Sequence, residues 1–185
     1  MHSGKADIIF LNGTSSAGKS SIAKALQSRL DRPCIHWCID DYLKLYPQDL
    51  WDGNTVSAQD WEQIIRGFHA AGAAMARENN LVIFDDVLEA EPPWIAHLLA
   101  LFEGLTVYFV GVHCPLDVLE RREQQRSDRK PGMARIQFEQ VHAKAIYDIE
   151  VDTSTLTSDE CAERILKYMA SFPQPDAVKR LQKMK

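Results

Sequence analysis

The chain has 185 residues, of which 45% are hydrophobic and 25% charged, a composition typical of one ordinary globular domain. Its net charge of −5 disfavours non-specific attraction to nucleic acids and anionic membranes. The apolar runs are shorter than the roughly 18 residues that a membrane span requires, and no long apolar segment precedes the first expected strand. We therefore expect a cytoplasmic protein with neither nucleic-acid nor membrane partners.

Short apolar runs alternate with helical patterns along the whole chain. The runs predict buried parallel strands, and apolar residues at helical spacing or a proline in the first turn predict the helices between them. In chain order we predict a strand at 8–11, a helix at 20–30, a strand at 34–39, a helix at 58–78, a strand at 81–85, a helix at 92–101, a strand at 106–112, a helix at 115–126, a strand at 147–152 and a helix after the capping box Thr157–Glu160. This order predicts an α/β fold with a doubly wound, mainly parallel five-stranded sheet between two helical layers, and ligands at the carboxyl ends of the strands.

The predicted organisation is a single domain over residues 1–172, with a helical lid at about 121–135. Residues 173–185 are polar and basic and contain two prolines, so we expect a loosely attached tail there. Val178, Leu181 and Met184 could nevertheless support a short helix in that tail.

A phosphate-binding motif follows the first predicted strand. Residues 13–20 match G-x-x-x-x-G-K-[ST] at every fixed position, between a strand and a helix. The glycines let consecutive N–H groups turn inward around an anion, and the helix adds its positive N-terminal end. We expect Lys19 to reach the β- and γ-phosphates and Ser20 to bind Mg²⁺; a flexible glycine loop without a ligand is the alternative. The predicted nucleotide contacts from this segment are Gly13, Thr14, Ser15, Ser16, Ala17, Gly18, Lys19, Ser20 and Ser21.

Paired aspartates end two of the predicted strands. Asp85, with Asp86 next, stands where a water-mediated Mg²⁺ ligand or a substrate contact is expected. Asp40 stands where a carboxylate can accept a proton from a substrate hydroxyl during phosphate transfer, with Asp41 beside it. Helix-capping or solvated loop aspartates are the alternatives.

A basic segment follows the fourth predicted strand, because five of the ten residues 121–130 are Arg or Lys. Such a run suits a lid over the transferring phosphate, with Arg126 and Arg129 as lid arginines, although solvated helix faces often look alike. Arg122 or Arg126 could also stack on the nucleotide base. The guanine-reading pattern Asn-Lys-x-Asp does not occur in the sequence, which favours ATP over GTP.

Aromatic residues surround the expected acceptor side. Tyr42 and Trp51 are candidate substrate contacts, together with Tyr46 and Trp61, which could line a pocket. Tyr42 and Trp61 could equally belong to the core.

The four cysteines fit a reducing compartment. Cys34 and Cys38 flank His36, which raises the question of a metal site, but no second ligand pair occurs elsewhere in the sequence. Buried structural thiols are the expectation.

With these residues in place, the chain resembles the chloramphenicol phosphotransferase family of P-loop kinases. The matching segments are IIFLNGTSSAGKSSIAKALQSRL, IDDYLKLYP, GAAMARENNLVIFDDV, YFVGVHCPLDVLERREQQRSDRKPGMA and YDIEVDTSTLTSDECAERI. The resemblance implies ATP-dependent phosphorylation of a small-molecule hydroxyl, with Asp40 as general base, Lys19 and Ser20 in the phosphate loop, and Arg126 and Arg129 in the lid. Residues 48–59 depart from the family pattern, which leaves the acceptor open.

The sequence therefore predicts an ATP- and Mg²⁺-dependent O-phosphotransferase acting on a small molecule, of the kind that modifies antibiotics. A nucleoside or metabolite kinase on the same scaffold is the first alternative. A nucleotide-binding switch or ATPase without an acceptor is the second, and Asp40 distinguishes it because a switch needs no acceptor base. The oligomeric state stays open.

Overall fold

One parallel sheet organises the molecule. The structure is a computed structural model that describes residues 6–47, 50, 56–88, 94–126, 132–172 and 174–183. The strand order is β2-β3-β1-β4-β5, and every neighbouring pair is parallel. The strands are β1 (Ile8–Asn12), β2 (Cys34–Cys38), β3 (Leu81–Asp86), β4 (Val107–His113) and β5 (Ile149–Asp152). The predicted five-stranded α/β sheet is thereby confirmed.

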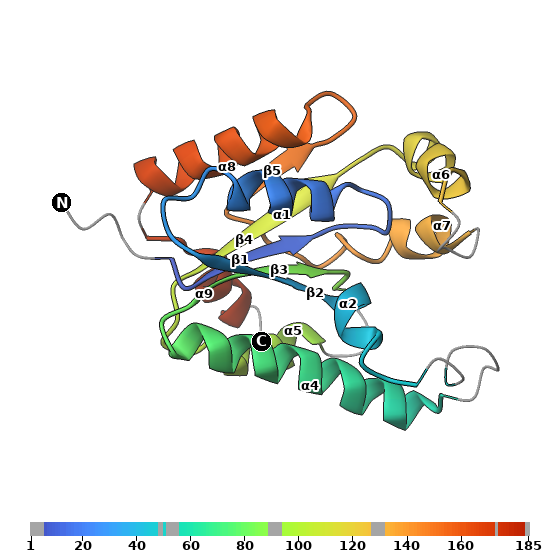
Figure 1. Cartoon of the computed structure of the whole chain (residues 1–185), viewed down its shortest axis with the longest axis horizontal. Coiled ribbons are helices and arrows are strands. Elements are labelled where there is room, and N and C mark those ends of the chain that lie inside the picture. The colour runs from blue at the N-terminus through green and yellow to red at the C-terminus, as the bar shows by residue number, and fades with distance from the viewer. Residues whose placement is uncertain are drawn as a thin grey trace.

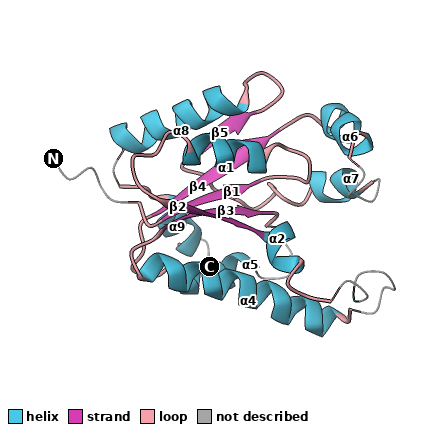
Figure 2. Cartoon of the chain, in the orientation of Figure 1, coloured by secondary structure: helices cyan, strands magenta, loops and turns pink. Residues whose placement is uncertain are grey.

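Helices cover both faces of this sheet (Figures 1 and 2). The two longer helices on one face are α1 (Lys19–Gln27) and α8 (Ser158–Ser171). The other face carries α4 (Ala58–Arg77), α5 (Trp94–Leu101) and α9 (Ala177–Gln182). Three further helices, α2 (Ile39–Leu43), α6 (Leu116–Gln124) and α7 (Met133–Phe138), lie near the carboxyl ends of the strands (Figure 1).

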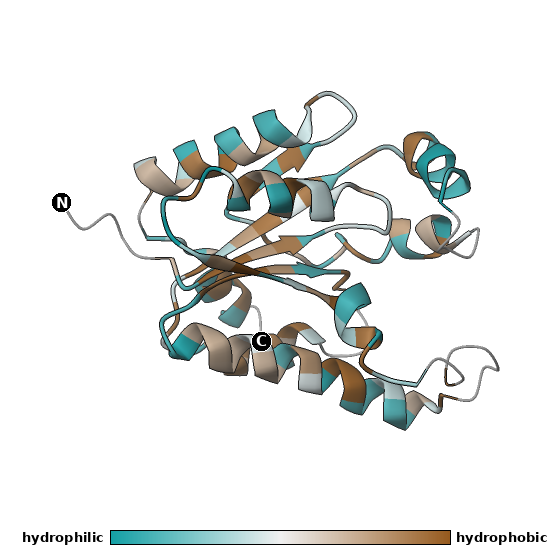
Figure 3. Cartoon of the chain, in the orientation of Figure 1, coloured by the Kyte–Doolittle hydropathy of each residue, from teal (hydrophilic) through white to brown (hydrophobic). Residues whose placement is uncertain are grey.

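The central strands are hydrophobic because both of their faces are covered. All five residues of β1 are buried, as are all six of β3. Phe10 stacks on Phe84 with ring centroids 5.3 Å apart on the α4 side, while Ile22 and Leu26 of α1 pack on the other side. Figure 3 shows the same pattern as a hydrophobic central layer between helices that carry both hydrophilic and hydrophobic residues.

Two helices begin at side-chain caps formed by residues that are close together in the sequence. Ser57 caps α4 by accepting a hydrogen bond from Asp60 N. At α8 the Thr157 side chain accepts from Glu160 N, and the Glu160 side chain accepts from Thr157 N. The predicted capping box is therefore present.

Several predicted boundaries differ from the structure. β2 ends at Cys38 instead of residue 39, so Asp40 and Asp41 lie in the first turn of α2. β5 begins at Ile149, two residues later than predicted. Helices α2 and α7 were not predicted.

The expectation of a loosely attached C-terminal tail is wrong for residues 174–183. They include helix α9, whose Ala177 and Leu181 are buried against the α4–α5 face of the sheet. Asp148 fixes the start of this helix, because its Oδ1 accepts hydrogen bonds from Asp176 N and Ala177 N. The weaker alternative of a short helix was the right one.

Among the described helices, none has the length and apolarity that crossing a bilayer would require.

Candidate functional site

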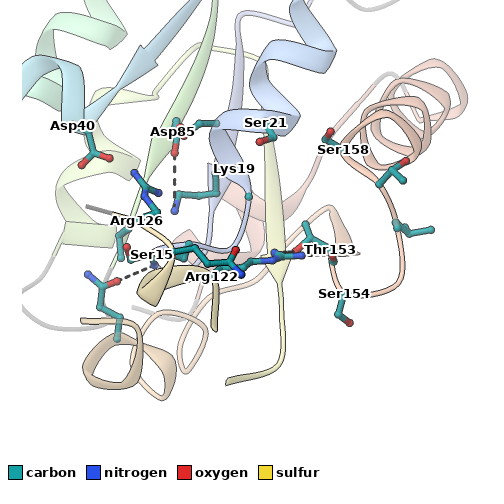
Figure 4. A pocket seen from close by; sticks show the side chains of 18 of the residues that line it. Ser15, Lys19, Ser21, Asp40, Asp85, Arg122, Arg126, Thr153, Ser154 and Ser158 are labelled. Carbon is teal, nitrogen blue, oxygen red and sulfur yellow. Dashed lines mark hydrogen bonds and ion pairs between the residues drawn. The ribbon is translucent and has the colours of Figure 1, made fainter. Parts of the chain in front are cut away.

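A cavity of about 790 Å³ opens at the carboxyl ends of the strands. This is the edge where open α/β sheets bind ligands, and the volume lies within the usual range for small-molecule sites. Its walls come from the phosphate loop, α2, the end of β3, α6, α7 and the β5–α8 loop (Figure 4). The lining residues include Ser15, Ser16, Gly18, Lys19, Ser20, Ser21, Asp40, Asp85, Arg122, Arg126, Gln137 and Thr153.

The phosphate loop is held tightly against the sheet. A side chain at Gly13 would collide with the backbone oxygen of Val112 in β4, and Gly18 has a φ of +92°, so both positions require glycine. Lys19 is buried and donates hydrogen bonds from Nζ to the backbone oxygens of Gly13 (2.8 Å) and Thr14 (3.2 Å). The loop therefore brings a buried cation and the N-terminus of α1 to one wall of the cavity.

The end of β3 contributes a buried carboxylate to the same wall. Asp85 Oδ2 accepts hydrogen bonds from Ser20 Oγ (2.6 Å) and His36 Nε2 (3.1 Å), and Lys19 Nζ lies 4.0 Å from Oδ1 (Figure 4). Burial alone would raise the pKa of Asp85, but the hydrogen bond from His36, the charge of Lys19 and the hydrogen bond from Ser20 outweigh it and lower that pKa. Asp85 is therefore an anion facing the phosphate loop.

Ser20 and Asp85 are a suitable donor set for Mg²⁺. They offer a hydroxyl and a carboxylate oxygen at the cavity wall beside the phosphate loop, and Mg²⁺ prefers hard oxygen ligands shared with substrate phosphates. His36, Cys38 and Asp85 also place one potential ligand atom each within 4.8 Å of one another. The sequence reasoning missed this group, because it sought ligands within β2 and the third member comes from the neighbouring strand.

The opposite end of the cavity is formed by α6 and the β5–α8 loop. Arg122 donates from Nη1 to Thr153 Oγ1 (2.9 Å) and from Nη2 to the Thr153 backbone oxygen (2.7 Å). Thr153 Oγ1 in turn donates to the Ala17 backbone oxygen of the phosphate loop (2.8 Å). These bonds fix a predicted arginine beside the loop, with Arg126 also in the wall (Figure 4).

Of the two aspartates predicted on the acceptor side, one lies in the cavity wall and the other on the surface. Asp40 lines the cavity, whereas the Asp41 side chain is 67% exposed and its Oδ1 accepts from Lys44 Nζ at 2.6 Å. Burial raises the pKa of Cys38 to about 12, and the nearby carboxylates of Asp85 and Asp40 add to that shift. Asp40 and Asp85 therefore contribute negative charge to the same end of the cavity.

Asp86, Tyr42 and Trp61 are not among the residues that line the cavity. Asp86 is buried and accepts from His69 Nε2 (2.8 Å) and from Val87 N (2.8 Å). Tyr42 packs against Trp37 and Phe68 near the core, and Trp61 is 40% exposed. Trp51 and Arg129 lie outside the described residues.

Sequence reasoning also missed Thr153 and Gln137. Thr153 stands in the segment YDIEVDTSTLTSDECAERI, which carries the resemblance but suggested no individual contact. Gln137 Oε1 accepts a hydrogen bond from Ser15 N at 2.9 Å, across 122 residues of sequence. A single glutamine in a polar segment carries no signal that could have identified it.

Comparison with known proteins connects this site to phosphate transfer. The family model described as "Chloramphenicol phosphotransferase-like protein" matches residues 6–170. Two strains of Mycobacterium tuberculosis contain a relative named "Putative O-phosphotransferase", 34% identical over 200 residues, which cover 95% of this chain and 88% of the relative.

Solved structures of kinases share the fold. An APS kinase from Mycobacterium tuberculosis superposes with a TM-score of 0.65 at 16% identity, over 89% of this chain and 98% of that one. A gluconokinase from Sinorhizobium meliloti gives 0.64 at 18% identity, over 92% and 94% of the two chains. Shikimate kinase from Acinetobacter baumannii gives 0.63 at 13% identity, over 91% and 95%. At these identities the likeness establishes the P-loop kinase fold alone.

Proposed function

Because the chain belongs to the chloramphenicol phosphotransferase-like family, we propose that it transfers the terminal phosphate of ATP to a hydroxyl of a small molecule. It is a kinase-type enzyme with a nucleotide-binding P-loop. The observation that carries the proposal is the cavity itself, in which Lys19, Asp85 and Asp40 face one space at the carboxyl edge of the sheet. Phosphate-binding groups and a candidate acceptor base thus line the same cavity.

The nucleotide would lie along the phosphate loop. Lys19 would leave the Gly13 and Thr14 carbonyls to neutralise the β- and γ-phosphates, and the Ser20 hydroxyl with Asp85 would hold Mg²⁺, which supplies further charge neutralisation. The nucleoside would extend toward Arg122 and Thr153. Arg126 would stabilise charge on the transferring phosphate, with Arg129 as a second lid arginine.

Asp40 would act on the acceptor. Its carboxylate accepts the proton of the acceptor hydroxyl while the hydroxyl oxygen forms a bond to the terminal phosphorus and the bond from phosphorus to the bridging oxygen of ADP breaks. Its place in the first turn of α2, at the cavity wall, supports this role; Asp41 is directed to solvent and paired with Lys44. The acceptor is a hydroxyl-bearing small molecule, with antibiotics of the chloramphenicol type as the first class to test.

The test begins with nucleotide binding. We expect Lys19→Ala to weaken Mg·ATP binding by roughly 10- to 100-fold, the loss of a hydrogen-bonding partner for a charged group. Lys24→Ala is the matched control, because Lys24 lies on the same helix and is exposed. Isothermal titration calorimetry measures both, and equal affinities in the two variants would refute the phosphate-loop role of Lys19.

The acceptor is then identified by mass spectrometry. Wild-type protein with Mg·ATP is screened against hydroxylated antibiotics, nucleosides and sugars for a mass gain of one phosphate. A phosphorylated product supports the proposed transfer and names its substrate. ATP hydrolysis without any phosphorylated product across the panel would favour the ATPase or switch alternative.

A further inference from the structure

The phosphate loop is held by a side chain from a distant helix. Ser15 N donates to Gln137 Oε1 at 2.9 Å, and both residues are buried, with 4% and 9% of their surface exposed. Gln137 belongs to α7 and lines the cavity. A buried carboxamide therefore stands between the start of the phosphate loop and the space where a nucleotide would bind.

The same part of the loop carries polar atoms without protein partners. Ser15 Oγ and Ser16 Oγ are buried, and neither has a hydrogen-bond partner among the described residues. Leaving a buried hydroxyl unsatisfied costs free energy, so such atoms in a cavity wall indicate a polar ligand. The amide Nε2 of Gln137 also has no hydrogen bond among the described residues, although it belongs to the same wall.

These groups lie at the transfer end of the cavity. Figure 4 shows Ser15 on the side of Lys19, Arg126, Asp85 and Asp40, with Thr153, Ser154 and Ser158 on the other side. If the nucleoside extends toward the β5–α8 loop, the terminal phosphate comes closest to Ser15. The dashed line at Ser15 marks its bond to the α7 carboxamide.

Helix α7 is anchored firmly enough to place that carboxamide. Glu123 of α6 is buried and accepts hydrogen bonds from Gly132 N (2.7 Å) and Ala134 N (2.9 Å) at the start of α7. Glu123 also follows Arg122 directly in the chain. The position of Gln137 is therefore tied to the helix that carries the nucleotide-facing arginine.

We propose that Gln137 binds the terminal phosphate of the nucleotide. Its Oε1 keeps the Ser15 main chain in place while its Nε2 donates a hydrogen bond to a terminal phosphate oxygen beside the Ser15 hydroxyl. This inference rests on the proposed function, because it assumes a nucleotide in the cavity. According to this proposal, α7 lets the protein bind a nucleoside triphosphate more tightly than a nucleoside diphosphate.

The test compares two nucleotides in three variants by calorimetry. The probes are the magnesium complexes of ADP and of the non-hydrolysable ATP analogue AMPPNP. Gln137→Leu keeps the approximate size but neither hydrogen bond. ADP should lose only the support of the Ser15 main chain, so AMPPNP affinity should fall roughly 10- to 100-fold more than ADP affinity. Gln137→Glu still accepts from Ser15 N but sets a carboxylate beside the phosphate, so AMPPNP affinity should fall further than in Gln137→Leu.

Gln140→Leu is the matched control, because Gln140 lies two residues beyond the end of α7 and is exposed. It should bind both nucleotides like the wild type. Equal losses of ADP and AMPPNP affinity in Gln137→Leu would overturn the proposal, since a residue that only shapes the loop affects both. AMPPNP binding by Gln137→Glu at the wild-type level would overturn it as well. Failure of the wild type to bind either nucleotide would instead refute the proposed function.

Discussion

Gly72 allows helix α4 to pack against the strand that carries Asp85. A Cβ atom at this position would lie 2.8 Å from Phe84 Cε1 and 2.8 Å from Trp37 Cδ1, and closer still to Phe84 Cζ. These are not mobile side-chain ends. The Phe84 ring is fully buried and stacks on Phe10, and the Trp37 ring stacks on Phe68 with centroids 5.4 Å apart. Gly72→Ala must therefore displace the helix or the core rings.

The magnitude follows from two opposing effects. Replacing glycine by alanine inside a helix stabilises it by about 1 kcal/mol. Forcing an added methyl into a packed core costs typically about 1–3 kcal/mol, and contacts with two rings at once place this case at the upper end. The expected net loss in the free energy of unfolding is about 2 kcal/mol, or a fall in Tm of roughly 4–8 °C for a chain of this size.

Gly67→Ala is the matched control on the same helix. Its Cβ would meet only the hydroxyl oxygen of Tyr42 at 2.7 Å and the adjacent ring carbon at 3.9 Å, and that hydroxyl is the outer end of a half-buried side chain, so a small shift relieves the contact. The same helix-propensity gain should leave this variant as stable as the wild type or up to about 1 kcal/mol more stable. Urea unfolding of both variants gives the comparison. A Gly72→Ala protein at least as stable as Gly67→Ala would refute the packing argument.

Two further predictions concern the acceptor base and the response to pH. Asp40→Asn should slow phosphate transfer about 10²–10⁴-fold while ATP affinity is retained, whereas a change at the exposed Asp41, Asp41→Asn, should have little effect. Mass spectrometry measures the phosphorylated product that each variant forms. The reverse ranking would mean that the base is Asp41. Burial, with the nearby charges of His113 and Lys19, lowers the pKa of His142 to about 4. As the pH falls, the unfolded chain therefore protonates His142 before the folded chain does. The folded state is fully stable with respect to this group above about pH 6.5 and loses stability as the pH falls toward 4. After allowance for solvent screening, the loss in the free energy of unfolding is about 1–3 kcal/mol. Urea unfolding between pH 7 and 4.5 should show that this free energy depends less on pH in His142→Gln than in the wild type. An unchanged pH dependence would contradict the role given to His142.

The sequence by itself determined the sheet and the phosphate loop, because both depend on local patterns. Continuous apolar runs mark buried parallel strands wherever they stand in a chain, and the sheet formed from the five predicted runs. The phosphate motif is a strand, a turn and a helix in succession, so residues 13–20 contain most of the information that their backbone shape requires. The α8 capping box is equally local.

Only the tertiary structure decided which side chains face the cavity. Asp40 and Asp41 look alike in sequence, yet the first turn of α2 places one in the cavity wall and the other in solvent beside Lys44. Asp85 and Asp86 separate in the same way, since one meets Ser20 and the other His69. A shift of one residue at a strand end reverses the direction of a side chain, and sequence patterns do not locate strand ends to that accuracy.

The remaining contacts join segments that only packing brings together. Gln137 reaches Ser15 across 122 residues and Arg122 reaches Thr153 across 31. Helix α9 also depends on tertiary packing, because its sequence has few apolar residues that could stabilise it in isolation. It is ordered where Ala177 and Leu181 cover apolar surface left open beside α5, and hydrophobic burial of that kind exists only once the sheet has formed.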